Sequence, residues 1–210
     1  MIADWLKWLW GSGGGWTVRV AAGVGIFTAL AIVDLRRHGR GATRWKEYLF
    51  LLACVAGTIA YAFANDMVTV TISPTYYLVH EGLPPDTPNV RAVAAIVAIK
   101  GASSVGLLLG AALLIANNPR KRKHRPQLSY RQLAAKMGYP LAGAVVASVV
   151  LGVPTALGWV DGLFGVTSAA ERSFACVLQI HLAAYVGGGL GGMAAVVSIL
   201  RRRRKLPRGP

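Results

Sequence analysis

Five long hydrophobic runs alternate with short polar segments along this chain of 210 residues. Each run is close to the roughly 20 apolar residues that an α-helix needs to cross a bilayer core of about 30 Å. The pattern therefore predicts an all-α membrane protein, with one transmembrane domain of about five helices over residues 16–200. The predicted helices are residues 16–33, 45–64, 93–116, 139–160 and 174–200.

The composition supports the membrane class. Hydrophobic residues make up 54% of the chain and charged residues only 15%, whereas an ordinary soluble domain has about 25% charged residues. The 23 Lys and Arg against 8 Asp and Glu leave a formal charge of +15. A soluble nucleic-acid-binding protein carries such an excess on a hydrophilic surface and lacks long apolar runs. Nucleic acid is therefore disfavoured as a partner.

The positions of the cations predict an orientation. Most Lys and Arg lie in three polar segments, which are residues 36–46, residues 120–136 and the tail at 201–210. Lys and Arg next to transmembrane helices stay on the cytoplasmic side. With five helices, all three segments fall on one side. We therefore predict an outer N-terminus and a basic cytoplasmic tail.

Two cationic runs lie directly beside predicted helix ends. A cation at the inner leaflet attracts anionic lipid by about 1 kcal/mol, so membrane lipids, anionic on the cytoplasmic side, are predicted partners. Simple anchoring of the topology, or binding of another anionic partner, stays open. The residues are Arg120, Lys121, Arg122, Lys123, Arg201, Arg202, Arg203 and Arg204.

Two segments outside the membrane have patterns of their own. Residues 1–15 combine three tryptophans with a glycine run, which predicts an interfacial segment with a hinge; a disordered tail is the alternative. Within the outer loop 65–91, residues 68–72 are β-branched and alternate between apolar and polar side chains. A Ser-Pro-Thr break and the aromatic run 76–79 follow, so the loop predicts a small extracytoplasmic β-hairpin.

Ionisable side chains inside a membrane span are costly and mark candidate functional sites. Lys100 and His181 each lie seven residues into a predicted helix, about 10 Å below the outer boundary. For Lys100, snorkelling to the headgroups or a structural hydrogen bond is the alternative to a substrate or proton role. For His181 the alternative is hydrogen-bonded packing. The candidate intramembrane polar layer consists of Lys100, Ser103, Ser104, His181 and Tyr185.

Small residues at helical spacing predict close helix packing, because they let backbones approach in a bilayer. Gly106 and Gly110 share one face of the third predicted helix. Gly188 and Gly192 share the face of His181 on the fifth. We expect these two stripes to pack together, with the first helix or another subunit as alternative mates.

No constellation for catalysis is recognisable. The acidic residues lie mostly at helix ends, and the chain lacks the sequence signatures of phosphate loops, hydrolases and zinc proteases. Cys54 and Cys176 stand in apolar runs and suit a packing role. No enzyme activity, metal or cofactor is predicted, and the identity of any cofactor is unknown.

Two short motifs give a resemblance. The segment Ser73-Pro74-Thr75-Tyr76 follows the second predicted helix, and His181, Tyr185, Gly187 and Gly188 stand in the last one. The chain resembles uncharacterised bacterial multi-spanning inner-membrane proteins with an outer S-P-x-Y segment and an H-x-x-x-Y-x-G-G last helix. The resemblance implies a bacterial inner membrane location. It also implies that the outer segment and the face of His181 and Tyr185 belong together.

Three function classes remain from the sequence. We expect an accessory or scaffolding membrane subunit without catalysis, which associates with other membrane subunits or with itself through the small-residue faces and the outer hairpin. The alternative is a small oligomeric transporter or channel that uses the layer of Lys100 and His181. An intramembrane enzyme is the least favoured class.

Overall fold

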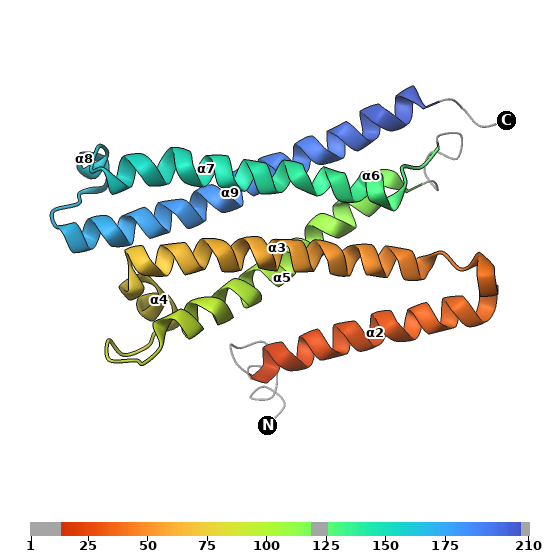
Figure 1. Ribbon diagram of the computed structural model, residues 1–210, viewed down its shortest axis with the longest axis horizontal. Helices are drawn as coiled ribbons and strands as arrows, with labels where there is room; N and C mark the ends of the chain where they lie inside the picture. Colours follow the sequence, from red (N-terminus) through yellow and green to blue (C-terminus); the bar gives the residue numbers. More distant parts are fainter. Residues whose placement is uncertain (1–13, 119–125, 207–210) are drawn as a thin grey trace. The chain divides into compact units, whose positions relative to one another are not determined.

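The computed structural model describes residues 14–118 and 126–206, and these residues contain helices and no β-strand. Figure 1 shows their arrangement along the chain. The elements are α2 (Gly14–His38), η1 (Gly39–Gly41), α3 (Arg44–Ile72), α4 (Pro74–Glu81), α5 (Val90–Asn117), α6 (Tyr130–Ala134), η2 (Ala135–Met137), α7 (Gly138–Ala156), α8 (Asp161–Phe164) and α9 (Ala169–Lys205).

Four helical stretches of the described part are long and apolar enough to cross a membrane: Arg44–Ile72, Val90–Asn117, Tyr130–Ala156 and Ala169–Lys205. In their most apolar windows only 17–28% of the residues are buried inside the protein. Apolar side chains therefore point mainly outward, as suits a lipid environment. The chain is a helical multi-pass membrane protein. Helix α2 covers the first predicted span, whose membrane crossing stays a prediction.

Some predictions concern residues outside the described part. They are the interfacial segment over its residues 1–13, the cations Arg120, Lys121, Arg122 and Lys123, and the last residues of the tail, 207–210.

The described chain divides into two compact units, with the boundary inside α3 after Leu52. In the first unit, α2 and the start of α3 are joined by a basic turn. The buried Asp34 carboxylate accepts hydrogen bonds from the backbone N–H groups of Thr43, at 3.1 Å, and Arg44, at 2.9 Å. It thereby caps α3, where an anion is favoured by the helix dipole. The Phe27 and Tyr48 rings stack, with centroids 5.3 Å apart.

The predicted hairpin in the loop 65–91 is wrong. Residues 68–72 form the last turns of α3, and residues 76–79 lie in α4. The β-branched alternation was misleading because the buried positions follow a helical period instead. Asp66, Thr69, Val70 and Ser73 are all nearly inaccessible, and their spacing of three, four and seven residues places them on one helix face.

In the second unit, α7 and α9 pack most closely. The glycines at this contact are Gly143 on α7 and Gly187 and Gly191 on α9. A Cβ atom at Gly187 would overlap the backbone of Gly143 and the Ala147 side chain, and one at Gly191 would overlap the backbone of Tyr139 and Pro140. Backbone lies directly against backbone here, as small residues allow in membrane helices.

The predicted glycine stripes are used differently. Gly106 packs against α3, because a Cβ atom there would meet Thr58 and the backbone of Val55. Gly188 lies at ordinary contact distance from α7, and Gly192 faces Leu109 of α5. Gly106 therefore does not pack on the helix of Gly188, and Gly192 contacts α5 at Leu109, which lies outside the predicted stripe. Gly110 is buried on α5.

Arg203 is not a lipid contact, contrary to the sequence prediction. Its side chain is buried, and its guanidinium donates hydrogen bonds to the carbonyls of Ala116 at 2.9 Å, Pro126 at 3.1 Å and Asn118 at 3.3 Å. These carbonyls lie at the end of α5 and in the segment that leads to α6. Arg203 therefore ties the end of α9 to the end of α5, while Arg201, Arg202 and Arg204 are exposed.

Replacing Arg203 by methionine is expected to lower stability, because buried carbonyls lose a charged donor. The cost is on the order of 2 kcal/mol, or about 5 °C in melting temperature. Circular dichroism of the detergent-solubilised protein during heating measures it. The exposed neighbour provides the control, since Arg204→Met should melt like the wild type. Equal melting of the two variants would show that the Arg203 contacts are not stabilising.

Candidate functional site

The candidate site lies where α4 contacts α3 and α9 in the second unit (Figure 1). Pro74 stands in the first turn of α4, where its missing N–H costs nothing. Gly82 ends the helix in the left-handed conformation, with φ of 65°, and its N–H bonds back to carbonyls of the last turn. The local sequence thus specifies a helix of two turns, which carries Tyr76 and Tyr77.

An apolar cluster seats α4 on its neighbours. Tyr77 is fully inaccessible and packs with Val70 of α3, Ala94 of α5 and Val177 of α9. The Tyr76 ring lies 5.4 Å from that of Phe174. The two tyrosines therefore anchor α4 to three helices, and their hydroxyl groups are carried into the protein.

His181 is the centre of a buried polar cluster, which we call the His181 cluster: Asp66, Thr69, Tyr76, Tyr77 and His181. Its Nε2 lies 3.1 Å from Asp66 Oδ1 and its Nδ1 lies 3.0 Å from the Tyr76 hydroxyl. The side chains of His181 and Asp66 are only 14% and 7% exposed. A carboxylate, an imidazole and a phenol thus follow one another in hydrogen-bonding contact, out of water.

This order of groups can accommodate two protonation states of His181. With a neutral ring, Nε2–H donates to Asp66 and Nδ1 accepts from the Tyr76 hydroxyl. With a protonated ring, Nδ1–H donates to the same hydroxyl oxygen, which has both roles available. The geometry can therefore hold or release one proton at Nδ1 without leaving a buried ring nitrogen unpaired.

Tyr77 and Thr69 close the cluster toward α3. Their hydroxyl oxygens are 2.5 Å apart, and the Thr69 hydroxyl also lies 3.0 Å from the carbonyl of Asn65, to which it donates. The Tyr77 and Thr69 hydroxyl groups therefore share one short hydrogen bond, in which either oxygen can be the donor. The Tyr77 oxygen is 3.5 Å from His181 Nε2, so it faces the same nitrogen as Asp66.

The surroundings keep both phenols protonated. Burial raises the pKa of Tyr77, the hydrogen bond with Thr69 lowers it in part, and the charge of Asp66 raises it further. Burial also raises the pKa of Tyr76, and electrostatic interaction with Tyr185 and Asp66 raises it further. Phenols with raised pKa values remain hydrogen-bond donors throughout the neutral range, so the described hydrogen-bond directions persist there.

Lys100 takes a different partner from the one that the predicted polar layer suggested. Its Nζ lies 3.3 Å from Glu81 Oε2, at the end of α4, and each side chain is 23% exposed. The ion pair joins α5 to α4. Lys100 and His181 thus both contact α4, through Glu81 and through Tyr76 respectively, and no direct contact between the two is described.

We expect Lys100→Ala to lower stability by less than about 1 kcal/mol, because a partly exposed ion pair gains little over solvation. The change should raise amide hydrogen exchange in the last turn of α4, next to Glu81. Hydrogen exchange with mass spectrometry on the purified protein measures both the size and the place of the effect. Glu81→Gln is the matched variant and should act alike; exchange changes in different segments would refute the pairing.

The remaining members of the predicted layer separate. Ser103 donates to the carbonyl of Lys100, one turn earlier in its own helix, at 3.0 Å. Ser104 is exposed. Tyr185 is largely exposed along its ring, and its hydroxyl comes close to Gly101 of α5. Of these three residues, only Tyr185 lies near enough to the His181 cluster to affect the pKa of Tyr76.

Sequence reasoning missed Asp66, Thr69, Tyr76 and Tyr77. The strand prediction for residues 68–72 ended the helix too early and placed Asp66 in a loop. The signal that could have found them is the helical spacing of Asp66, Thr69 and Ser73, three polar residues that share one face. The resemblance implied that the S-P-x-Y segment and the face of His181 belong together. In the structure Tyr76, the last residue of that segment, lies beside the His181 ring.

The described residues offer no recognisable metal site. No three His, Cys, Asp or Glu side chains in 14–118 and 126–206 are grouped so that they could hold an ion. Cys54 and Cys176 are both buried and free. At the His181 cluster, Asp66, His181 and Tyr76 are placed for hydrogen bonding and proton exchange.

Comparison with known proteins gives no family. The chain matches no protein-family model, no curated protein and no solved structure. The geometry of the described residues is thus the basis for assigning a function.

Proposed function

We propose that this chain is a non-catalytic accessory or scaffolding subunit of a bacterial inner-membrane complex. It would have five transmembrane helices, an outer N-terminus and a cytoplasmic C-terminus. In this orientation α4 lies at the outer membrane surface. The cationic loop and tail then lie on the cytoplasmic side, as the distribution of Lys and Arg favours.

One observation carries the proposal: the ionisable groups expected inside the membrane are used to hold α4. Lys100 pairs with Glu81, and His181 pairs with Asp66 and Tyr76. A carrier keeps such groups available to a substrate in a cavity near the membrane midplane. Groups committed to one short helix instead support a role in presenting that helix to another protein.

The packing of the glycines supports an association surface other than the one expected from the sequence. Gly106, Gly188 and Gly192 face α3, α7 and α5 of the same chain, so they are not available to a partner. The outward side of α4 is available, with Thr75 and Val79 exposed. Because the opposite side of α4 is anchored by Tyr76 and Tyr77, this surface is held in a fixed position.

Affinity purification from native membranes tests the proposal. The full chain carries a C-terminal tag, is extracted in mild detergent and is compared with the variant Val79→Asp, in which the His181 cluster is intact. We expect a larger membrane protein in stoichiometric amount with the wild type and its loss with Val79→Asp. Recovery of this chain alone, as a monomer or homo-oligomer, would count against the accessory role.

A small oligomeric transporter or channel is the second candidate, favoured by the hydrogen-bonded series Asp66, His181 and Tyr76. In this case the protein in liposomes would pass protons or a proton-coupled solute. The flux would vanish in Asp66→Asn and persist in Lys100→Gln, since Lys100 contacts Glu81 rather than the His181 cluster. Absence of a pH-driven flux in liposomes would eliminate the candidate.

A further inference from the structure

A cationic groove lies between α7 and α9, far along α9 from His181. It is an open groove with a volume of about 470 Å³, and it is lined by Tyr139 of α7 and a single face of α9. The α9 residues recur at helical spacing over eleven positions, a rise of about 16 Å. They are Ala194, Val197, Ser198, Arg201, Arg202 and Lys205.

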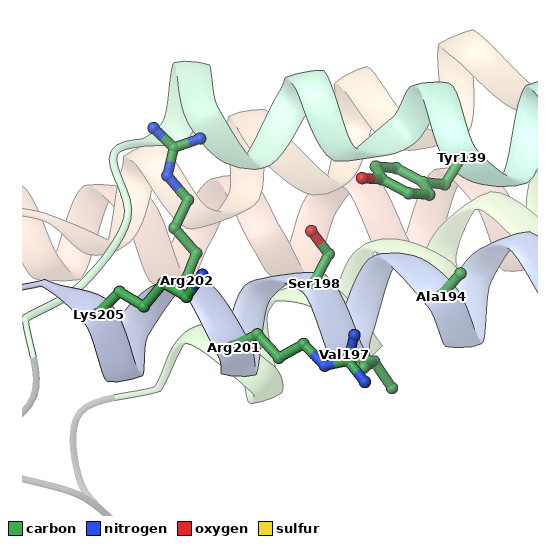
Figure 2. A pocket seen from close by; sticks show the side chains of 7 residues that line it. All are labelled: Tyr139, Ala194, Val197, Ser198, Arg201, Arg202 and Lys205. Atoms are coloured by element: carbon green, nitrogen blue, oxygen red, sulfur yellow. The ribbon is translucent and has the colours of Figure 1, made fainter.

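The lining changes character along the groove. Ala194 and Val197 make one end apolar, Ser198 follows, and Arg201, Arg202 and Lys205 make the other end cationic. Figure 2 shows Arg202 extending from α9 toward α7, and the hydroxyl groups of Tyr139 and Ser198 directed into the space between the helices. This order matches a molecule with an apolar body and an anionic head.

A further cation is fixed beside the groove. Lys136 Nζ donates to Ser198 Oγ at 2.8 Å and lies 5.2 Å from the centre of the Tyr139 ring. The Ser198 hydroxyl accepts from Lys136 and also hydrogen-bonds with the Tyr139 hydroxyl. Donation from Ser198 to Tyr139 leaves the Tyr139 hydrogen for another acceptor. A hydroxyl pair with one remaining donor thus lies among several cations.

The positive charge is not neutralised by carboxylates within the described chain. The described ion pairs involve Asp34, Glu81, Asp161 and Asp66, and none reaches Arg201, Arg202 or Lys205. The groove also lies where the apolar part of a candidate membrane span gives way to the basic end of α9. Headgroup phosphates occupy this level of a bilayer, where cations attract them.

We propose that the groove binds one anionic phospholipid, with its phosphate among Ser198, Arg201, Arg202 and Tyr139 and the start of an acyl chain along Val197 and Ala194. This inference does not rest on the accessory role. It differs from general attraction of a basic tail to the leaflet, because it assigns the lipid to lining residues and not to all exposed cations.

Binding of short-chain phosphatidylglycerol to the full-length protein tests the assignment. The protein is stripped of lipid in an uncharged detergent, and bound lipid is measured by native mass spectrometry. The variant Arg201→Gln/Arg202→Gln is compared with Arg131→Gln/Arg204→Gln, which removes the same charge from exposed residues outside the lining. We expect the dissociation constant to rise at least about tenfold in the first variant and less than about twofold in the second.

Two further arms distinguish the sources of the anion. Phosphatidylcholine should not bind with comparable affinity, and inorganic phosphate at millimolar concentration should not displace phosphatidylglycerol. Displacement by phosphate would overturn the lipid assignment in favour of a free anion. Equal losses in the two double variants would also overturn it, because attraction would then depend on total charge.

A variant without a charge change guards against misfolding. Tyr139→Phe/Ser198→Ala removes both hydroxyl groups and should weaken phosphatidylglycerol binding about fivefold. Wild-type size in gel filtration establishes that each variant is folded. Unchanged binding by this folded variant would contradict the placement of the phosphate.

Discussion

Replacing Gly187 by leucine is expected to abolish the folded protein. A Cβ atom at this position would overlap the backbone of Gly143 and the side chain of Ala147, and backbone cannot move aside as a flexible side chain does. Overpacking at a helix contact of this kind costs more than about 3 kcal/mol. We expect the variant to be lost from the monodisperse peak in gel filtration after extraction in mild detergent.

The same glycine run contains its control. Gly189 is two residues away on α9, and a Cβ atom there would meet nothing within 4 Å. Gly189→Leu adds the same side chain to the same helix and should leave the gel-filtration peak and the melting temperature unchanged. Equal behaviour of the two leucine variants would refute the close packing of α7 on α9.

Removal of either member of the buried pair formed by Asp66 and His181 is expected to have the second large effect. Asp66→Ala leaves His181 Nε2 without its carboxylate, and His181→Ala leaves the buried carboxylate with the longer hydrogen bond from Asn65, at 3.3 Å. Each change should cost on the order of 3 kcal/mol, since a hydrogen bond to a charged group is lost where water does not replace it. Thermal unfolding in detergent measures the loss.

A double-mutant cycle distinguishes this contact from two separate defects. The Asp66→Ala/His181→Ala protein should lose less stability than the sum of the single variants, by about 1–3 kcal/mol. Ser104→Ala, an exposed position on α5, is the control and should not change melting. Strict additivity in the cycle would mean that the two side chains do not interact.

Hydrogen exchange places the effect in the structure. Because Tyr76 donates to the His181 ring when that ring is neutral, loss of the ring should loosen α4 before the spans unfold. Exchange in residues 74–81 should therefore rise in His181→Ala. His181→Gln keeps polar atoms near Asp66 and Tyr76, so it should restore part of the protection. A rise spread over all helices would argue against a local role.

The long elements of this protein follow from the sequence by itself. Runs of about 20 apolar residues specify membrane helices whatever they pack against, because the backbone must satisfy its hydrogen bonds internally in lipid. The predicted stretches 45–64, 93–116 and 174–200 accordingly lie inside helical stretches long and apolar enough to cross a membrane, and the stretch 139–160 overlaps one that ends at Ala156. The excess of cations in particular loops is also visible without a structure.

The sequence does not determine which helices pack together, because several helix pairings are compatible with the same spacing of small residues. Gly106 could have packed on the helix of Gly188 as well as on α3, since a small residue permits close approach without specifying the partner. The glycines that make the closest contact, Gly143, Gly187 and Gly191, were recognisable only once α7 and α9 lay together.

The candidate site depended on tertiary structure for the same reason. His181 could be selected from the sequence, since an ionisable residue in a span is costly alone. Its partners Asp66 and Tyr76 lie 115 and 105 positions away. The helical spacing of Asp66, Thr69 and Ser73 indicates a shared polar face but does not indicate that His181 contacts it. Residues 68–72 have β-branched side chains that favour a strand. They are nevertheless helical, because the helix buries side chains of this segment against α4, α5 and α9. The sequence alone therefore determined that the protein belongs to the membrane class and that placing His181 in a span costs free energy. Only the tertiary structure determined which groups offset that cost.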